Sequence, residues 1–409
     1  MFAKSNKVYL IIAAMLIASL LLASCGPTAT PPPEQPPAEE PQAPQATEAP
    51  QEPAPAETVA PPAEAPAEVI PVRVGMTPFF DYQFWAVAKE FGWDKELGLD
   101  LQFTWLTQSG PSIQALAAGD LDMVNTCVVC NFPFYESVPE MVDFLNVNQF
   151  KGFVVIGRQG QSKSYEEFLA ELNDPEAAKI ATIEQFRGKT FPEYLANYEP
   201  LLTAVLDQAG MTIDDVTTLN FPDDEKAALA LIGGTGDFYM GGLPSEINLL
   251  QNHPDQFKLI GGAEILGPAG LWYSNVASST EWLEANPEVA LRIMAMSYRF
   301  NRYVQEKRDV VLPIVVKAMN DHSGVATNEE NLSFIFDTFL DFRTYQQDQE
   351  TAFNPDSPFY WENSAKYYVE KSTELPEGAD YNKQNPMNEW FETFLQRPDL
   401  LGWVDAPLE

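Results

Sequence analysis

Residues 72–126 read VRVGMTPFFDYQFWAVAKEFGWDKELGLDLQFTWLTQSGPSIQALAAGDLDMVNT, and this stretch decides the fold. Short apolar runs at 72–76, 99–106 and 122–126 predict three strands. Each pair of runs is separated by a segment with helical spacing of its apolar residues. Because strands alternate with helices, the stretch predicts an α/β fold with a parallel sheet.

Two helices are expected between these strands. Asp81 is placed to cap the first, and Pro111 lies in the first turn of the second, which Gly119 ends. The residues expected on the buried face of the first helix are Phe84, Trp85, Ala88 and Phe91.

The later half of the chain repeats this organisation. Residues 115–124 form a helix end, a Gly-Asp turn and a strand, and residues 228–241 have the same order. Such an echo is what two similar α/β lobes would leave in a sequence. Strand-like stretches at 152–158 and 270–277 flank the second lobe, and we expect them to be crossovers that act as hinges.

Composition excludes several classes of function. The 409 residues contain 24 basic and 59 acidic side chains, a formal net charge of −35, which disfavours nucleic acid or an anionic membrane surface as a partner. Only two histidines are present, so no histidine-rich metal site is expected. Three cysteines are too few for a disulfide-dense scaffold, and no phosphate-binding Gly-x-x-x-x-Gly-Lys loop appears. We expect neither cofactor nor metal.

The N-terminus is typical of an exported lipoprotein. Lys4 and Lys7 precede an apolar run at 9–22, and small residues then lead to Cys25. The stretch Leu22-Ala23-Ser24-Cys25-Gly26 resembles a bacterial lipobox. This resemblance implies a signal peptide over 1–24 and acylation of Cys25, for example with palmitate. The alternatives are an ordinary secretory cleavage site or an uncleaved anchor. Residues 25–70 are rich in Pro, Ala and Glu, which predicts a disordered tether.

Several short motifs, in order along residues 72–306, resemble one family. They are Val74-Gly75-Met76-Thr77-Pro78, Ala86-Val87-Ala88-Lys89-Glu90-Phe91-Gly92, Glu96-Leu97-Gly98-Leu99-Asp100-Leu101, Ala115-Leu116-Ala117-Ala118-Gly119-Asp120, Phe186-Arg187-Gly188-Lys189-Thr190, Leu206-Asp207-Gln208-Ala209-Gly210-Met211 and Asn286-Pro287-Glu288-Val289-Ala290. This set is similar to solute-binding proteins of ABC importers, in the nitrate/sulfonate/taurine and thiamine-pyrimidine-precursor group. The tail beyond Asp309 matches that group poorly.

The resemblance implies a type II periplasmic binding protein of two lobes joined by two hinge crossovers. The first lobe would comprise residues 71–152 and 275–409, the latter including C-terminal helices, and the second residues 153–274. It further implies a monomer, without enzymatic activity, that closes on one small molecule and delivers it to an ABC permease served by separate ATPase subunits. The expected location is the outer face of the cytoplasmic membrane, or the periplasm, through the lipid anchor.

The ligand class stays open at this stage. Many members of the group follow the strand after Gly188-Lys189 with a Gly-Ser turn that can hold an anion, whereas this chain has Glu193 there. A heteroaromatic or amine-bearing organic molecule is therefore expected over a sulfonate- or nitrate-like solute. The alternatives are an enzyme like those that make the thiamine pyrimidine, and an envelope sensor that uses the same binding head.

Candidate ligand-binding residues follow from the position of the strand ends, because ligands of open α/β sheets bind outside the carboxyl ends of strands. In the first lobe they are Thr77, Phe79, Asp81, Tyr82, Ser109, Gly110, Thr126, Cys127 and Asn131. Asp81, Ser109 and Gly110 are equally suited to capping helices. The spacing of Cys127 and Cys130 fits a disulfide, two buried thiols or, less well, thiol chemistry.

In the second lobe the same rule selects acids, glycines and aromatic residues. The candidates are Glu193, Tyr194, Asp223, Gly241, Gly242 and Trp272. Asp223 is equally suited to a solvated surface, the two glycines to close backbone packing, and Trp272 to the core of a hinge.

Overall fold

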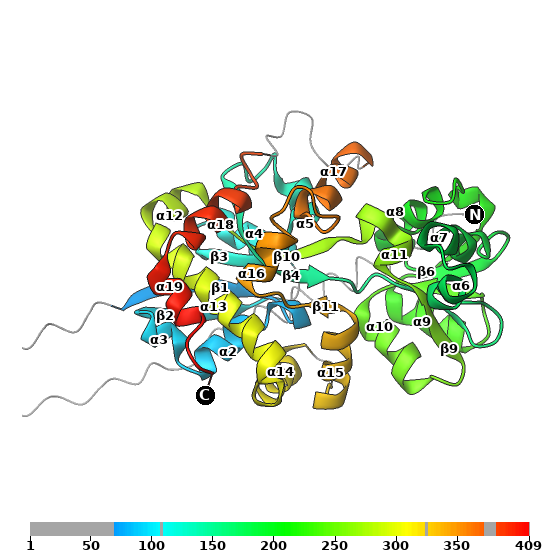
Figure 1. The fold of residues 1–409 in the computed structure, drawn as a ribbon, viewed down its shortest axis with the longest axis horizontal. Coiled ribbons are helices and arrows are strands. Elements are labelled where there is room, and N and C mark those ends of the chain that lie inside the picture. The colour runs from blue at the N-terminus through cyan, green and yellow to red at the C-terminus, as the bar shows by residue number, and fades with distance from the viewer. Residues whose placement is uncertain (1–68, 107–108, 324–325, 372–381, 409) are drawn as a thin grey trace, which may run out of the picture. The chain divides into compact units, whose positions relative to one another are not determined.

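A computed structural model describes residues 69–106, 109–323, 326–371 and 382–408 (Figure 1). The predictions for the signal peptide, for Cys25 and for the tether up to residue 68 lie outside the described residues.

A six-stranded sheet carries the first group of elements. Its strands, in spatial order, are β11 (Leu340–Asp341), β4 (Met141–Phe150), β10 (Trp272–Ser279), β3 (Met123–Cys127), β1 (Ile70–Met76) and β2 (Leu99–Trp105). The three strands predicted from residues 72–126 are therefore confirmed, within a few residues at each end.

The expected parallel sheet is mixed. β1 pairs in parallel with β2 and β3, but β10 runs antiparallel between β3 and β4, and β11 is antiparallel to β4. The strand-like stretch at 270–277 corresponds to β10, but its pairing with β3 and β4 could not be predicted from local alternation, because it returns from a distant part of the chain.

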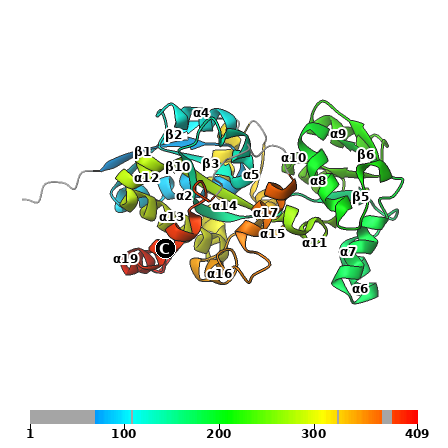
Figure 2. The ribbon, with the colours of Figure 1, turned by 90° about the horizontal axis from the view of Figure 1, so that it is seen from above.

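Helices cover both faces of this sheet, with α4 and α13 on opposite sides (Figure 2). Adjacent strand residues point to opposite cores: Met123 lies in one and Val124 in the other. The helices of this group that precede α13 are η1 (Phe80–Tyr82), α2 (Phe84–Glu90), α3 (Trp93–Glu96), α4 (Ser109–Ala117), α5 (Val128–Asn131), η2 (Phe132–Phe134) and α12 (Thr280–Ala285). The others are α13 (Pro287–Glu306), α14 (Arg308–His322), α15 (Glu329–Thr338), α16 (Tyr345–Glu350), α17 (Trp361–Lys371), α18 (Met387–Leu395) and α19 (Pro398–Val404).

The first predicted helix differs from expectation at its start and at its end. Asp81 lies in η1, and Gln83 precedes α2 without a capping side-chain bond, so Asp81 does not cap this helix. Phe84 and Trp85 are fully buried as expected, but the side chain of Phe91 is 37% exposed. Trp85 also donates a hydrogen bond of 2.8 Å to Asn125 Oδ1, which fixes the helix against β3.

A second group of elements is inserted between β4 and β10. It has a three-stranded antiparallel sheet of β8 (Phe238–Met240), β5 (Val155–Arg158) and β9 (Phe257–Gly261), and a parallel pair of β6 (Thr190–Glu193) and β7 (Thr217–Asn220). Its helices are α6 (Tyr165–Leu172), α7 (Pro175–Glu184), α8 (Leu195–Asp207), η3 (Ile213–Asp215), α9 (Asp224–Ile232), α10 (Leu243–Ile247), η4 (Asn248–Asn252), α11 (Ala263–Leu266) and η5 (Gly267–Gly270). Its core contains the stacked rings of Phe191 and Phe238, and the ring of Phe186 packs edge-on against both.

Two segments connect the groups, one between β4 and β5 and one between β9 and β10. Arg343, in the C-terminal segment, holds the ends of both neighbouring strands. Its guanidinium donates to Gln149 Oε1 at the end of β4 and, at 3.2 Å, to the hydroxyl of Tyr273 at the start of β10. None of the helices among the described residues is long and apolar enough to cross a membrane.

Candidate ligand-binding edges

Four strand ends and two strand starts, those of β10 and β11, meet at one edge of the six-stranded sheet. Met76 is in register with Trp105, and Trp272 with Phe150. The carboxyl ends of β1, β2, β3 and β4 therefore lie beside the start of β10. This edge, named here the first edge, collects the candidates that precede residue 132 together with Trp272.

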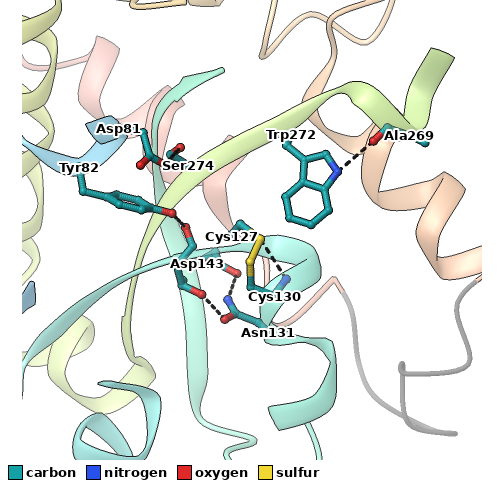
Figure 3. The surroundings of a disulfide bond; sticks show 10 residues. Asp81, Tyr82, Cys127, Cys130, Asn131, Asp143, Ala269, Trp272 and Ser274 are labelled. Atoms are coloured by element: carbon teal, nitrogen blue, oxygen red, sulfur yellow. Dashed lines mark hydrogen bonds between the residues drawn. A yellow bond between two sulfur atoms is a disulfide. The ribbon is translucent and has the colours of Figure 1, made fainter. Parts of the chain in front are cut away.

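Asp81 is the buried acid of the first edge. Its carboxylate accepts a hydrogen bond from the Ser274 hydroxyl on β10 (Figure 3). Its carbonyl accepts one of 2.7 Å from Asn148 Nδ2 on β4. Burial is the main cause that raises the pKa of Asp81 to about 6. The bond to Ser274 replaces the predicted helix cap.

Three further candidates bond to one another. The Tyr82 hydroxyl donates to the Thr126 carbonyl, and the Thr126 hydroxyl donates to Asn131 Oδ1. Asn131 Nδ2 in turn donates to Asp143 Oδ2 at 2.8 Å. Burial raises the pKa of Asp143 to about 7. These side chains are all buried, so their hydrogen bonds support the first edge from the interior of the protein.

Cys127 and Cys130 form a disulfide, which decides between the alternatives left open by their spacing. Cys127 ends β3, and its sulfur also accepts a hydrogen bond of 3.0 Å from the backbone N–H of Cys130. The disulfide therefore fixes the short turn that carries Asn131.

The remaining candidates of the first edge differ in exposure. Phe79 is 39% exposed, whereas Thr77 is fully buried. Ser109 and Gly110 begin α4 and are half-buried. Trp272 is half-buried, and its indole N–H donates a bond of 2.9 Å to the Ala269 carbonyl.

A small pocket lies at this edge, and a larger one lies elsewhere. The small pocket, between Cys127, Trp272 and Trp361 of α17, has about 10 Å³, room for about one water molecule. A pocket of about 420 Å³ lies between α12, α13 and α18, lined by Leu283, Leu291 and Trp390 among others, away from every candidate residue.

A second edge is formed by the carboxyl ends of β6, β7 and β8. The backbone N–H of Asp237 donates to the Thr190 carbonyl at 2.8 Å, and the Thr190 N–H donates to Asp237 Oδ2 at 2.9 Å, so β6 and β8 start side by side. The structure brings Glu193, Gly241 and Gly242 together at their ends. Tyr194 follows β6 and is half-buried. Asp223 instead caps α9 and forms an ion pair with Lys226 at the surface.

Sequence reasoning missed four side chains of the second edge. Asp224, in the first turn of α9, accepts hydrogen bonds from the Tyr239 hydroxyl and, at 3.2 Å, from the backbone N–H of Gly242. Glu246 of α10 is fully buried beside them. Burial and the charges of Asp224 and Glu246 raise the pKa of Tyr198 on α8. The acids at 223 and 224 were visible, but no spacing showed which of them turns inward.

Gly241 is required by this arrangement. A Cβ at Gly241 would lie 1.9 Å from the Tyr239 hydroxyl and 2.3 Å from Asp224 Oδ1. The close approach of the backbone is therefore what allows the bond between Tyr239 and Asp224 to form.

Comparisons with known proteins find likeness in structure and none in sequence. No family model matches the chain, and no curated protein matches it. The sulfonate-binding protein SsuA of Escherichia coli is 13% identical, with a TM-score of 0.56 over 78% of this chain and 92% of its own. A putative SsuA of Methylobacillus flagellatus KT is 15% identical, with a TM-score of 0.57 over 82% and 97%.

The nitrate-binding protein NrtA of Synechocystis PCC 6803 is 11% identical, with a TM-score of 0.51 over 83% of this chain and 92% of its own. The fold is that of a periplasmic binding protein. The resemblance predicted from the short motifs is thereby confirmed at the level of the fold. These neighbours are named as periplasmic sulfonate- and nitrate-binding proteins, and one of the names includes a sulfonate ABC transporter.

Reduction of the disulfide should destabilise the first edge. The bond closes a very short loop, so we expect its loss to lower the free energy of unfolding by roughly 2 kcal/mol. Urea unfolding with and without a phosphine reductant measures the change, and the double variant C127S/C130S should reproduce it without reductant. Equal stability of oxidised and reduced chains would contradict a structural role.

Asp143 should make stability depend on pH in an unusual direction. Its pKa of about 7 in the folded chain exceeds the ordinary value of 3.8, so the folded chain binds the proton more tightly. The free energy of unfolding should then fall as pH rises from about 4 to 7, by roughly 2–4 kcal/mol from this group. Asp143→Asn should remove that part of the slope in urea unfolding, whereas the exposed Asp214→Asn should keep it.

Gly241→Ala should break the bond between Tyr239 and Asp224 and cost about 1–3 kcal/mol of unfolding free energy. Gly402→Ala is the control, because a Cβ there meets no atom within 4 Å and α19 gains helix propensity. Chemical denaturation of both variants at neutral pH compares them. A tolerated Gly241→Ala would mean that the backbone at the second edge can move aside.

Proposed function

We propose that this chain is the solute-binding lipoprotein of an ABC importer. It captures a small organic molecule between a lobe of residues 71–152 and 275–409 and a lobe of residues 153–274, and delivers it to a permease. The periplasmic-binding-protein fold supports this proposal, and so do the named functions of its structural neighbours.

The observation that carries the proposal is the position of the two edges relative to the crossovers. β4 ends at the first edge and leads into the first crossover. β5 begins after that crossover, with Val155 in register with Met240 at the end of β8. Both sets of candidate residues therefore border the connecting segments, as expected for the two walls of one binding site.

In this mechanism the solute binds one edge and closure adds contacts from the other. A solute can drive closure only through a higher affinity for the closed form, so both edges must contact it. No covalent step is needed, and the disulfide leaves neither Cys127 nor Cys130 as a free thiolate for an enzymatic alternative.

The leader and the tether complete the proposed function. Acylation of Cys25 would hold the chain at the outer face of the cytoplasmic membrane, since two or more acyl chains give stable anchoring. The acidic, proline-rich residues 26–68 would keep the binding head at a distance from the lipid. Radiolabelled palmitate should be incorporated into the wild-type chain and not into Cys25→Ser.

A thermal-shift screen tests the solute-binding function. The compounds should include heteroaromatic, amine-bearing, sulfonate and nitrate solutes. A solute at 100 times its Kd stabilises the folded chain by about 2.7 kcal/mol and so raises its Tm. Recovery of the solute unchanged after incubation would exclude turnover. If no compound in a broad metabolite set raises the Tm, the proposed function is wrong.

A further inference from the structure

Three carboxylates, of which two are buried and one is half-buried, lie at the second edge, and each ends or follows a different strand. Glu193 ends β6, Asp224 follows β7, and Glu246 follows β8. We name these three side chains the acid cluster. Asp224 acts electrostatically on both Glu193 and Glu246, which places the three within one neighbourhood.

Glu193 and Glu246 are the two unsatisfied members of the acid cluster. Both side chains are 0% exposed, and neither carboxylate oxygen of either residue has a hydrogen-bond partner in the described part of the structure. For Glu193, burial first, then the charges of Glu199 and Asp224, raise the pKa well above the ordinary range. A buried carboxylate without a partner is costly, so this position is adapted to something that pairs with it.

Asp224 and Glu246 add negative charge without any counter-ion among the described residues. Asp224 is held by Tyr239 and by the N–H of Gly242, and the backbone at Val154 and Gly241 lies against the carboxylate of Glu246. Burial raises the pKa of both carboxyls. Within the described part of the chain, no Lys or Arg forms an ion pair with any of the three.

The acid cluster faces the crossover from the first lobe. Val154 is the residue that precedes β5, and it lies against Glu246. The cluster is thus at the edge where the second lobe meets its connection to the first. A charged group of a solute held between the lobes would reach it there.

We propose that the acid cluster receives a cationic group of the transported solute, an ammonium or a guanidinium, with Glu193 as its main partner. This inference rests on the proposed solute-binding function and names the chemical class of the solute. A cation would supply the positive charge and the hydrogen-bond donors that the three carboxylates lack. Among the described residues, no group of three or more His, Cys, Asp or Glu side chains is arranged to hold a metal ion, which favours an organic cation.

A purely structural cluster would behave differently with pH. In that case the carboxyls stay protonated and solute binding is independent of them. If Glu193 pairs with a cation, it must lose its proton on binding, so affinity rises with pH and protons are released. The charged groups that act on Glu193 are Glu199 from α8 and Asp224 from α9. Tyr198 of α8 interacts with Glu193, Asp224 and Glu246, and with Tyr194, the residue before α8.

The first arm of the test compares probes of different charge by thermal shift with the wild-type chain. Agmatine, choline and benzylamine are the cations, benzyl alcohol and cytosine the neutral compounds, and ethanesulfonate and nitrate the anions. We expect the cations alone to raise the Tm. If neutral or anionic compounds in this set or in the broad screen raise it and cations do not, the inference is overturned while the solute-binding function stands. If no compound of any charge binds, both fail.

The second arm measures the Kd of the best-binding cation by calorimetry. Glu193→Gln should weaken binding by about 10- to 100-fold, the effect of losing one charged hydrogen bond. Glu225→Gln is the matched control, because Glu225 neighbours Asp224 on α9 but is exposed. It should change the Kd by less than about twofold.

Calorimetry in buffers of different ionisation enthalpy gives the protons released on binding. We expect release by the wild-type chain and less by Glu193→Gln. Asp224→Asn, which keeps an acceptor for Tyr239, serves as a second variant if Glu193→Gln does not fold. Cation binding that is unchanged in the folded variants, or that releases no protons, would overturn the inference.

Discussion

The pairing of β10 between β3 and β4 is the constraint on which the rest of the molecule depends. β10 returns after an insertion of more than 100 residues and places Trp272 opposite Phe150. The inserted elements therefore leave and rejoin the large sheet at one edge. Because that edge also receives the carboxyl ends of β1, β2 and β3, the connections and the candidate residues are brought together by the same hydrogen bonds.

Both edges bury carboxyl groups, but they satisfy them differently. At the first edge, Asp81 is paired with Ser274, and Asp143 with Asn131, so hydroxyl and amide donors from neighbouring strands compensate for burial. At the second edge, Glu193 has no such donor. At the first edge each buried acid has at least one donor, although Asp143 Oδ1 has none among the described residues, whereas at the second edge neither carboxylate oxygen of Glu193 or of Glu246 has a partner there. This difference makes the second edge the better candidate for receiving a donor from a partner.

Periodicity and turn residues predicted the fold well and the site only in part. The strands at 72–76 and 122–126 and the turn at Gly119 follow from local pattern, because each is specified by residues close in sequence. The pairing of Ser274 with Asp81 joins residues 193 positions apart, so no local pattern could replace the expected helix cap with it. Glu193 was found because it ends a strand. Asp224 and Glu246 were missed because both lie in the first turn of a helix. The sequence alone does not show whether an acid in that position faces the interior or the solvent.

Arg343 bears on how the two lobes could move. Its guanidinium bonds to Gln149 and to Tyr273, and Asp341 Oδ2 accepts from it at 2.7 Å. The end of β4 and the start of β10 are thereby bonded to the same guanidinium. In the proposed function, closure of the inserted lobe would have to be absorbed outside this contact, in the few residues on each side of it. The C-terminal segment, which resembles the family least, would then set where the molecule bends.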